Sequence, residues 1–244
     1  MDTKIAVIMG ATSGIGREVA RMLLLKGWKV GICGRRRDLL ESLKCEFPRQ
    51  VEVLEADVQD SGTAERLAGF VGRLGARLYL HCSGVGWQNP RLEEGKEIAT
   101  LLTNGEGFVR CVGAVFRLFS STGGHIAVIS SIAGTRGLGP APAYSATKRM
   151  QNTYIDALEQ LACMRHLDIN FTDIRPGFVR TALINGGKGY PMAMECGYAA
   201  RRIVRAIEKK RRVEVIDWRY AVLVALWRCI PRFLWKRFPF PAAK

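Results

Sequence analysis

Met9-Gly10-Ala11-Thr12-Ser13-Gly14-Ile15-Gly16 is the stretch of sequence that decides the fold. A short apolar run from Lys4 to Met9 leads into it, and residues 17–24 follow it with apolar side chains at helical spacing. Glycines permit backbone dihedrals and close approaches that any Cβ would block. The start of a helix also offers unpaired N–H groups and the positive end of its dipole to an anion. The pattern therefore predicts a phosphate-binding turn between a strand and a helix, with an ordinary tight turn as the alternative.

Short β-branched runs alternate with longer stretches of helical period along the rest of the chain. This alternation predicts an α/β protein with a parallel sheet that helices cover on both faces. The expected strands are apolar on both sides, as residues 126–129 illustrate, which suits a sheet buried front and back. We expect strands at residues 4–9, 29–33, 51–54, 77–82, 124–130, 167–174 and 213–216.

The composition fits one compact domain and excludes several classes of protein. The 244 residues are 48% hydrophobic and 24% charged, which excludes a disordered or collagen-like chain. The seven cysteines are scattered without a C-x-x-C pair, and the three histidines have no His or Cys partner at metal-ligand spacing. We therefore predict neither a disulfide framework nor a metal site. The first strand runs into the glycine turn without the features of a signal peptide, so we expect a cytoplasmic protein.

The end of the second expected strand bears on which nucleotide the turn binds. An NAD-binding protein would place an acidic side chain there to hold the ribose 2′-hydroxyl. This chain places Gly34-Arg35-Arg36-Arg37 there instead. Guanidinium groups bind a 2′-phosphate through charge-assisted hydrogen bonds, whereas an acid would repel it. Arg35 and Arg36 therefore predict NADPH as the preferred cofactor; the alternative is that the arginines only form a solvated helix start.

Ser131, Tyr144 and Lys148 form the strongest candidate catalytic group. Tyr144 and Lys148 are four residues apart on an expected helix and so lie on one face of it. A nearby ammonium favours phenolate over phenol, so we expect Lys148 to lower the pKa of Tyr144 and make it a general acid. Taken singly, each residue has another explanation: Y-x-x-x-K occurs by chance on solvated helices, and Ser130-Ser131 could be a cap or turn at a strand end.

The spacing G-x-x-x-G-x-G at residues 10–16, followed in order by Ser131, Tyr144 and Lys148, resembles the short-chain dehydrogenase/reductase family. The resemblance covers residues 4 to about 216 and implies a doubly wound Rossmann-type fold with a seven-stranded parallel sheet. It also implies that Ser131 hydrogen-bonds the oxygen that Tyr144 protonates. On this basis we expect a catalytic domain at residues 1–216 and an NADP(H)-dependent oxidoreductase that interconverts a ketone and a secondary alcohol.

The resemblance assigns further residues to the cofactor. It implies that Asp57 contacts the adenine amino group, and that the backbone near Pro176 and the hydroxyl of Thr181 meet the nicotinamide carboxamide and the phosphates. Two residues depart from the family pattern, because Met9 stands in place of Thr and Cys82 in place of Asn. The complete predicted cofactor set is Gly10, Thr12, Ser13, Gly14, Ile15, Gly16, Arg35, Arg36, Asp57, Val58, Ser83, Gly84, Tyr144, Lys148, Pro176, Gly177, Val179 and Thr181.

Asn104 falls where the family has an asparagine that disturbs a helix and holds a water next to the lysine, so it completes the predicted catalytic set. The alternative is a polar residue at a break between two helices. Further along, the segment from Ala182 to Glu195 contains Gly186, Gly187, Gly189, Pro191, Met192 and Met194. This composition resembles a substrate lid, although a flexible surface loop would have the same composition.

The net charge of +15 favours an anionic partner, and residues 217–244 contribute much of it with six basic side chains and one acid, Asp217. We treat this segment as a basic, aromatic C-terminal extension that Pro231 divides into two short helices. Trp, Phe and Leu beside Lys and Arg are typical of a segment that lies in a membrane interface. Packing on the domain's own core, an oligomer contact and nucleic-acid binding are the alternatives, and we expect no nucleic acid because no recognition module accompanies the charge.

These observations lead to one principal hypothesis and two others. The principal hypothesis is an NADPH-dependent reductase of an apolar or lipid-like carbonyl substrate that forms a homo-oligomer and contacts a membrane peripherally through residues 217–244. The alternatives are a catalytically inactive nucleotide-binding sensor and a peripheral membrane-binding protein on the same fold.

Overall fold

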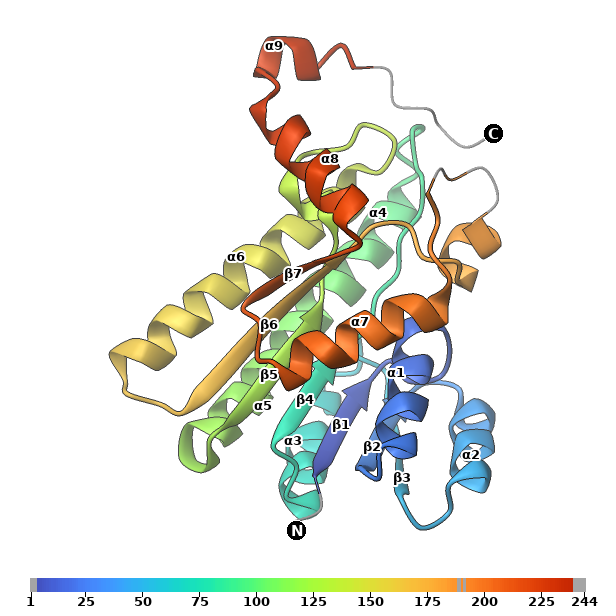
Figure 1. Cartoon of the computed structure of the whole chain (residues 1–244), viewed down its shortest axis with the longest axis vertical. Coiled ribbons are helices and arrows are strands. Elements are labelled where there is room, and N and C mark those ends of the chain that lie inside the picture. The colour runs from blue at the N-terminus through green and yellow to red at the C-terminus, as the bar shows by residue number, and fades with distance from the viewer. Residues whose placement is uncertain (1–3, 188–189, 191, 239–244) are drawn as a thin grey trace.

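The computed structural model describes residues 4–187, 190 and 192–238, whose strands form one parallel sheet (Figure 1). The strand order is β3-β2-β1-β4-β5-β6-β7, and each neighbouring pair runs parallel. The strands are β1 (Ile5–Met9), β2 (Lys29–Gly34), β3 (Val51–Glu55), β4 (Leu78–His81), β5 (Gly124–Ile129), β6 (Ile169–Pro176) and β7 (Val213–Ile216). All of them overlap the expected ranges, so the predicted seven-stranded α/β fold is confirmed.

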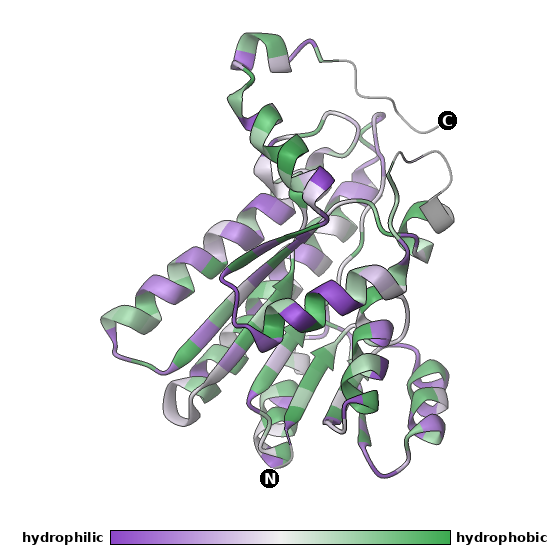
Figure 2. Ribbon diagram, viewed as in Figure 1, coloured by the Kyte–Doolittle hydropathy of each residue, from purple (hydrophilic) through white to green (hydrophobic). Residues whose placement is uncertain are grey.

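Helices cover both faces of this sheet and bury an apolar cluster on each. The first cluster contains residues of α1 (Gly14–Leu25), α2 (Arg37–Glu46), α7 (Cys196–Glu208) and α8 (Trp218–Cys229). The second contains residues of α3 (Thr63–Leu74), α5 (Phe108–Thr122) and α6 (Pro142–Met164). In β1, Ile8 joins the first cluster and Val7 the second, and both are fully buried. This explains why the strands are apolar on both sides. In Figure 2 the central strands of the sheet are mostly green, the colour of hydrophobic residues.

The strand order reverses at β1, which pairs with β2 on one side and with β4 on the other. The chain builds outward from β1 to β3 and then returns to place β4 on the opposite side of β1. In doubly wound sheets, ligands bind outside the carboxyl ends of the strands where the order reverses. Met9, the last residue of β1, lies opposite both Cys33 and His81, so the glycine turn that follows it lies at this point.

The helical segment around Asn104 is interrupted, as the sequence predicts. α4 (Glu94–Leu101) passes into a π-helical turn, η1 (Leu102–Gly107), and the chain then continues as α5. Asn104 lies within the π-helical turn and is fully buried. Single π-helical turns widen a helix locally and occur often at functional sites.

The C-terminal helices pack on the domain through one side. Pro231 separates α8 from α9 (Arg232–Trp235), which confirms the predicted division into two short helices. Tyr220, Val224 and Trp227 of α8 are buried and belong to the first apolar cluster. Packing on the domain's own core, one of the alternatives for this segment, therefore accounts for the inner side of α8. Residues 239–244 lie outside the described residues.

Several polar contacts attach these helices to residues 135–137, which follow β5, among them a hydrogen bond of 2.5 Å from Arg136 to the Ile230 carbonyl. Trp227 Nε1 donates to Thr135 Oγ1 over 2.9 Å, and Trp235 Nε1 donates to the Gly137 carbonyl over 2.9 Å. Arg136 donates to the Trp227 carbonyl over 2.9 Å and stacks its guanidinium 4.7 Å from the centre of the Trp235 ring. The described residues include no helix with the length and apolarity needed to cross a membrane.

Two buried histidines predict a loss of stability in acid. Burial lowers the pKa of His125 to about 4 and that of His81 to about 3, from an ordinary value of 6.5. As the pH falls from 6.5 towards 4, the unfolded chain therefore binds protons that the folded chain does not. The free energy of unfolding should fall over this window, by about 1.4 kcal/mol per pH unit for each histidine.

Urea denaturation at pH 7, 6 and 5 measures this slope. His125→Gln should flatten it, because a neutral amide can still bond the Thr172 hydroxyl, which lies 2.8 Å from His125 Nε2 in the wild type. His166→Asn, at an exposed position, is the matched control and should leave the slope unchanged. Parallel slopes for the wild type and His125→Gln would contradict the prediction.

Candidate active site

The glycine turn is packed so closely that two of its positions have no room for a Cβ. Gly10 has a φ of +90°, and a Cβ there would lie 2.6 Å from the backbone nitrogen of Ser83. A Cβ on Gly16 would lie 2.2 Å from the carbonyl oxygen of Gly10. Only glycine allows the turn to lie this close to the end of β4. Ser83 and Gly84, both predicted cofactor residues, are thereby brought next to the turn.

The start of α1 offers a set of hydrogen-bond donors that fits a phosphate group. The first N–H groups of a helix have no partner within it, and they carry the positive end of the helix dipole. α1 begins at Gly14 after Ser13, whose backbone is extended. The predicted turn is therefore present with the donors that a pyrophosphate needs.

The two predicted arginines lie beside this turn. Arg36 Nη2 is 2.7 Å from both Thr12 Oγ1 and Ser13 Oγ. Arg35 Nη1 is 3.6 Å from a carboxylate oxygen of Asp57. Thr12 and Ser13 follow β1 and Asp57 follows β3, which are the two neighbours of β2. Arg36 therefore reaches toward β1 and Arg35 toward β3 at the carboxyl end of β2.

The two serines after β5 have different partners. The Ser130 hydroxyl donates to the buried carboxylate of Asp173, which also accepts a hydrogen bond of 2.7 Å from Arg175 Nε. The Ser131 hydroxyl accepts from the Ala133 N–H over 3.1 Å and faces the Pro176 carbonyl at 3.5 Å, and it lies close enough to Tyr144 to lower the pKa of that phenol. Ser130 is therefore bonded to a side chain of β6, whereas Ser131 is the serine that lies near Tyr144, the predicted proton donor.

The pKa of Tyr144 runs opposite to the prediction. Burial raises it above its ordinary value, and the hydrogen bond with Ser131 offsets this only in part. The expectation that Lys148 lowers the pKa is therefore wrong for this structure; Lys148 Nζ lies 5.8 Å from the centre of the Tyr144 ring. The ring packs against Gly86, where a Cβ would lie 2.6 Å from it. Tyr144 is thus held as a neutral phenol that can donate a proton.

Lys148 is almost fully buried, with 4% of its surface exposed. Its ammonium donates to the carbonyl of Ile129 and to Oε1 of Gln151, each over 3.0 Å. Burial lowers the pKa of Lys148 to about 8, although the thiol of Cys82 and the carboxylate of Asp173 oppose this. Lys148 can therefore change its charge within the ordinary working range of pH.

Asn104 lies in the same group of residues. Its side-chain amide donates to the Val85 carbonyl over 2.6 Å and accepts from the Val85 N–H over 2.8 Å, which fixes the loop after β4. A Cβ on Gly84 would lie 3.2 Å from Asn104 Oδ1 and 3.7 Å from Lys148 Nζ. The structure therefore brings all four predicted catalytic residues together at the carboxyl edge of the sheet.

The predicted P-G motif forms the opposite side of the site. A Cβ on Gly177 would lie 2.4 Å from the ring of Tyr220, so α8 packs directly against the residue after Pro176. The Thr181 side chain lies close to the glycine turn: a Cβ on Gly14 would lie 3.2 Å from the methyl group of Thr181. The end of β6 and the turn after β1 therefore lie next to each other.

Three further predicted residues have mainly packing contacts. Ile15 packs against the first apolar cluster. Val58 is buried and packs closely against Gly107, where a Cβ would lie 2.7 Å from the Val58 carbonyl oxygen. Val179 is buried and forms a parallel bridge with Met194, which anchors the far end of the predicted lid. The near end of that lid forms a short 3-10 helix at Ala182–Gly187. Gly189 and Pro191, which were part of the lid prediction, lie outside the described residues.

Three residues of the site were not predicted. Gln151 bonds Lys148, Gly86 packs against Tyr144, and Tyr220 packs against Gly177. The position of Gln151, three residues after Lys148 on the same helix face, is the only local sequence signal among them. The other two contacts join segments that are far apart in the sequence.

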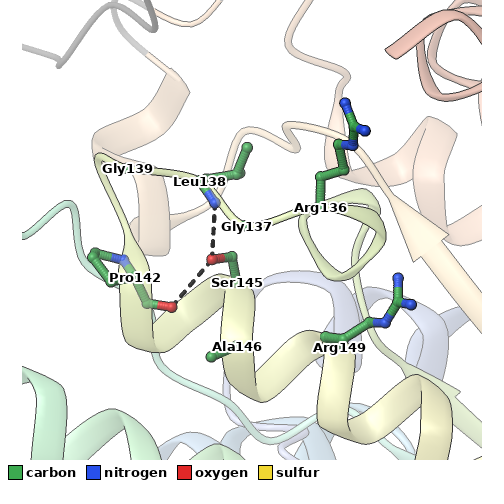
Figure 3. A pocket seen from close by; sticks show the side chains of 8 residues that line it. All are labelled: Arg136, Gly137, Leu138, Gly139, Pro142, Ser145, Ala146 and Arg149. Carbon is green, nitrogen blue, oxygen red and sulfur yellow. Dashed lines mark hydrogen bonds between the residues drawn. The ribbon is translucent and has the colours of Figure 1, made fainter. Parts of the chain in front are cut away.

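A cavity of about 580 Å³ lies between α6 and the loop after β5, and Figure 3 shows its lining. Arg136 and Arg149 line it, together with apolar and glycine residues. Its α6 residues are Pro142, Ser145, Ala146 and Arg149, which helical spacing places on the side of α6 away from Tyr144 and Lys148. This cavity is therefore separate from the group of predicted catalytic residues.

Comparison with known proteins agrees with this geometry. A family described as short chain dehydrogenase matches residues 4–187. An oxidoreductase of Myxococcus xanthus is 30% identical over 95% of this chain and 94% of its own length. A Xenopus laevis protein named dehydrogenase/reductase SDR family member 7B is 27% identical over 87% of this chain and 73% of its own length.

Two solved structures show how closely the fold is shared. A short chain dehydrogenase from Burkholderia cenocepacia in complex with NADP has a TM-score of 0.84 at 19% identity and covers 98% of this chain and 99% of its own. An alcohol dehydrogenase from the archaeon Thermococcus sibiricus, complexed with 5-hydroxy-NADP, has a TM-score of 0.76 at 26% identity and covers 88% and 95%.

Proposed function

We propose that this chain, which belongs to the short-chain dehydrogenase/reductase family, is an NADPH-dependent reductase that interconverts a ketone and a secondary alcohol. The observation that carries the proposal is the grouping of Tyr144, Lys148 and Ser131 at the edge of the sheet that also holds the glycine turn, with Lys148 Nζ 5.8 Å from the centre of the Tyr144 ring. An oxidoreductase that uses a nicotinamide cofactor needs a proton donor at that edge, and Tyr144 is the group placed to serve.

The residues around the glycine turn fit the cofactor. The close backbone approach at Gly10 and Gly16 and the donors at the start of α1 would hold the pyrophosphate. Bound NADPH would supply the hydride that reduces the carbonyl carbon. Tyr144 would give its proton to the carbonyl oxygen, while Ser131 donates a hydrogen bond to the same oxygen. Lys148 would stabilise the negative charge left on Tyr144 after the transfer. Before the reaction, burial raises the pKa of Tyr144 and keeps the proton on the phenol, as a proton donor requires.

The preference for NADPH over NADH is supported by Arg36 and Arg35 at the end of β2. Arg36 bonds the two hydroxyls of the turn, and Arg35 pairs with Asp57, so both guanidiniums lie where a 2′-phosphate would meet them. Two of the structures with similar folds are described in complex with NADP or a derivative of it. Charge-assisted hydrogen bonds to a phosphate are among the strongest that a protein makes.

An apolar substrate is supported by the aromatic side chains near Tyr144. Trp87 follows Gly86, which packs on the Tyr144 ring, and is partly exposed. The rings of Phe178 and Tyr190 lie 4.5 Å apart between the centroids, next to the P-G motif. Such surfaces favour an apolar group over a charged one.

Peripheral membrane contact by residues 217–244 is supported by the outer side of α8. Trp218, Val222 and Leu226 are spaced four residues apart, and Trp218 and Leu226 are 73% and 65% exposed. Arg228, Arg232, Lys236 and Arg237 are exposed beside them. Apolar side chains next to basic ones suit an anionic membrane interface. The inner side of the same helix packs on Gly177, so this contact would lie directly over the reaction site.

Association of identical chains is supported by a second exposed apolar surface. Ile98, Leu101 and Leu102 are exposed on α4 and η1, and Met150 is exposed on the adjacent α6. Exposed apolar side chains from neighbouring elements favour a protein contact.

A cytoplasmic location also stays a prediction.

Replacing Tyr144 by phenylalanine tests the proposed reaction. Tyr144→Phe removes only the hydroxyl, so kcat for NADPH-dependent reduction across a panel of hydrophobic ketones should fall by about 100- to 10,000-fold. The dissociation constant for NADPH should change little, which fluorescence titration measures. Tyr154→Phe, on the same helix, is the matched control and should keep its activity. Unchanged turnover in Tyr144→Phe would favour the alternative of a nucleotide-binding sensor.

Replacing Arg36 by alanine tests the cofactor preference. The loss of charge-assisted hydrogen bonds should raise the dissociation constant for NADPH by about 10- to 100-fold and leave that for NADH nearly unchanged. Arg37→Ala is the matched control, since Arg37 pairs with Glu41 and Glu55 instead of the turn. Equal losses of affinity for both nucleotides in Arg36→Ala would show that Arg36 does not read the 2′-phosphate.

Vesicle sedimentation tests the membrane contact. The full chain should bind phosphatidylcholine vesicles that contain phosphatidylserine, and the triple variant Arg228→Gln, Arg232→Gln, Lys236→Gln should bind about 100-fold more weakly, at about 1 kcal/mol per charge. Leu226→Ser should also weaken binding, whereas Met164→Ser, at an equally exposed position on α6, should not. Binding that survives both tail variants would count against contact through this segment.

A further inference from the structure

The side-chain amide of Gln151 joins the buried lysine to the π-helical turn. Its Oε1 lies 3.0 Å from Lys148 Nζ, and its Nε2 lies 2.8 Å from the backbone carbonyl oxygen of Asn104. Gln151 and Asn104 are fully buried, and Lys148 is 4% exposed. These two hydrogen bonds form a continuous path from the ammonium to the turn.

The chemistry of the two partners fixes the orientation of this amide. An ammonium only donates hydrogen bonds, so it must meet the amide oxygen of Gln151. A backbone carbonyl only accepts, so the amide nitrogen must face Asn104. A flipped amide would lose both bonds in a buried site, at the full cost of unpaired polar groups. Gln151 can therefore hold Lys148 in only one way.

We propose that Gln151 is a positioning residue that holds the Lys148 ammonium by direct contact and ties it to the backbone of the π-helical turn. This inference rests on the proposed function, because the position of Lys148 matters to the reaction only if Tyr144 transfers a proton. Gln151 thus fixes the position of the Lys148 ammonium beside Tyr144.

The bonding of the ammonium supports this role. Two of its three N–H groups point to Ile129 O and Gln151 Oε1, which leaves one for a bound molecule. A Cβ on Gly84 would lie 3.7 Å from Nζ, so the open side of the ammonium is at the loop after β4. Removing Gln151 would free the side chain to leave this direction.

The charged and titratable groups around Lys148 come from three elements. Tyr144 lies on the same helix, His81 and Cys82 come from the end of β4, and Asp173 comes from β6. Gln151 contributes a neutral acceptor among them. Giving residue 151 a negative charge should therefore raise the pKa of Lys148, and making it apolar should lower that pKa. A purely structural role of Gln151 would not produce shifts in opposite directions.

Two variants of matched size test the proposal through the pH dependence of kcat. Activity should fall above the pKa of Lys148, because only the ammonium stabilises the charge that forms on Tyr144. Gln151→Met removes the acceptor and should move this alkaline limb to lower pH by about one unit, the size of one hydrogen bond to a charged group. Gln151→Glu adds a carboxylate and should move it to higher pH. Thr153→Ala, exposed on the same helix, should leave the limb in place.

A second measurement does not depend on activity. The pKa of Lys148 is about 8 in the folded chain and 10.5 ordinarily, so the unfolded chain binds more protons between these values and the free energy of unfolding should rise with pH. Gln151→Glu should reduce this rise, and Gln151→Met should extend it to lower pH. Shifts in the same direction for both variants, by either method, would overturn the proposal. If no carbonyl compound is reduced but the stability shifts are opposite, the proposed function fails while the contact stands.

Discussion

The close approach of the Gly10 backbone to the end of β4 is the constraint on which the rest of the site depends. A Cβ at Gly10 would lie 2.6 Å from Ser83 N, so the turn and the loop after β4 can meet only because the side chain is absent. The meeting occurs where the strand order reverses, between β1 and β4. It places the turn beside Ser83, and the next residue, Gly84, lies against both Asn104 and Lys148. A nucleotide-binding turn and a proton-transfer group therefore share one edge of the sheet.

Burial, more than pairwise charge, determines the electrostatics of this edge. It raises the pKa of Tyr144 and lowers that of Lys148 to about 8, so Tyr144 stays a neutral phenol while Lys148 keeps its charge only below about pH 8. Polar neighbours then offset part of the cost of burial: Ser131 lowers the pKa of Tyr144, and Lys148 donates hydrogen bonds to Ile129 and Gln151. Such a site keeps a proton on the phenol until a substrate oxygen can take it, and it provides a charge that is held in place.

The sequence predicted the features that depend on local pattern. The strands, the glycine turn and the break at Pro231 follow from spacing, glycine and proline. The interrupted helix at Asn104 was expected from the family resemblance. The direction of the Tyr144 pKa shift was not predicted, because it depends on burial by segments distant in sequence. The packing of Tyr220 on Gly177 was not predicted either, because the two residues lie on different elements that are distant in sequence. Gln151 shows the intermediate case, since its helix face was predictable but its partner in the π-helical turn was not.

A crystal structure of the chain with NADPH and a ketone analogue would test the central claim most directly. The account predicts that the pyrophosphate lies on the N–H groups of the turn at residues 10–16. It also predicts that the carbonyl carbon lies about 3–3.5 Å from the nicotinamide C4 atom, with the carbonyl oxygen bonded to the hydroxyls of Tyr144 and Ser131. A nicotinamide ring bound elsewhere, with the Tyr144 hydroxyl pointing away from it, would contradict the account.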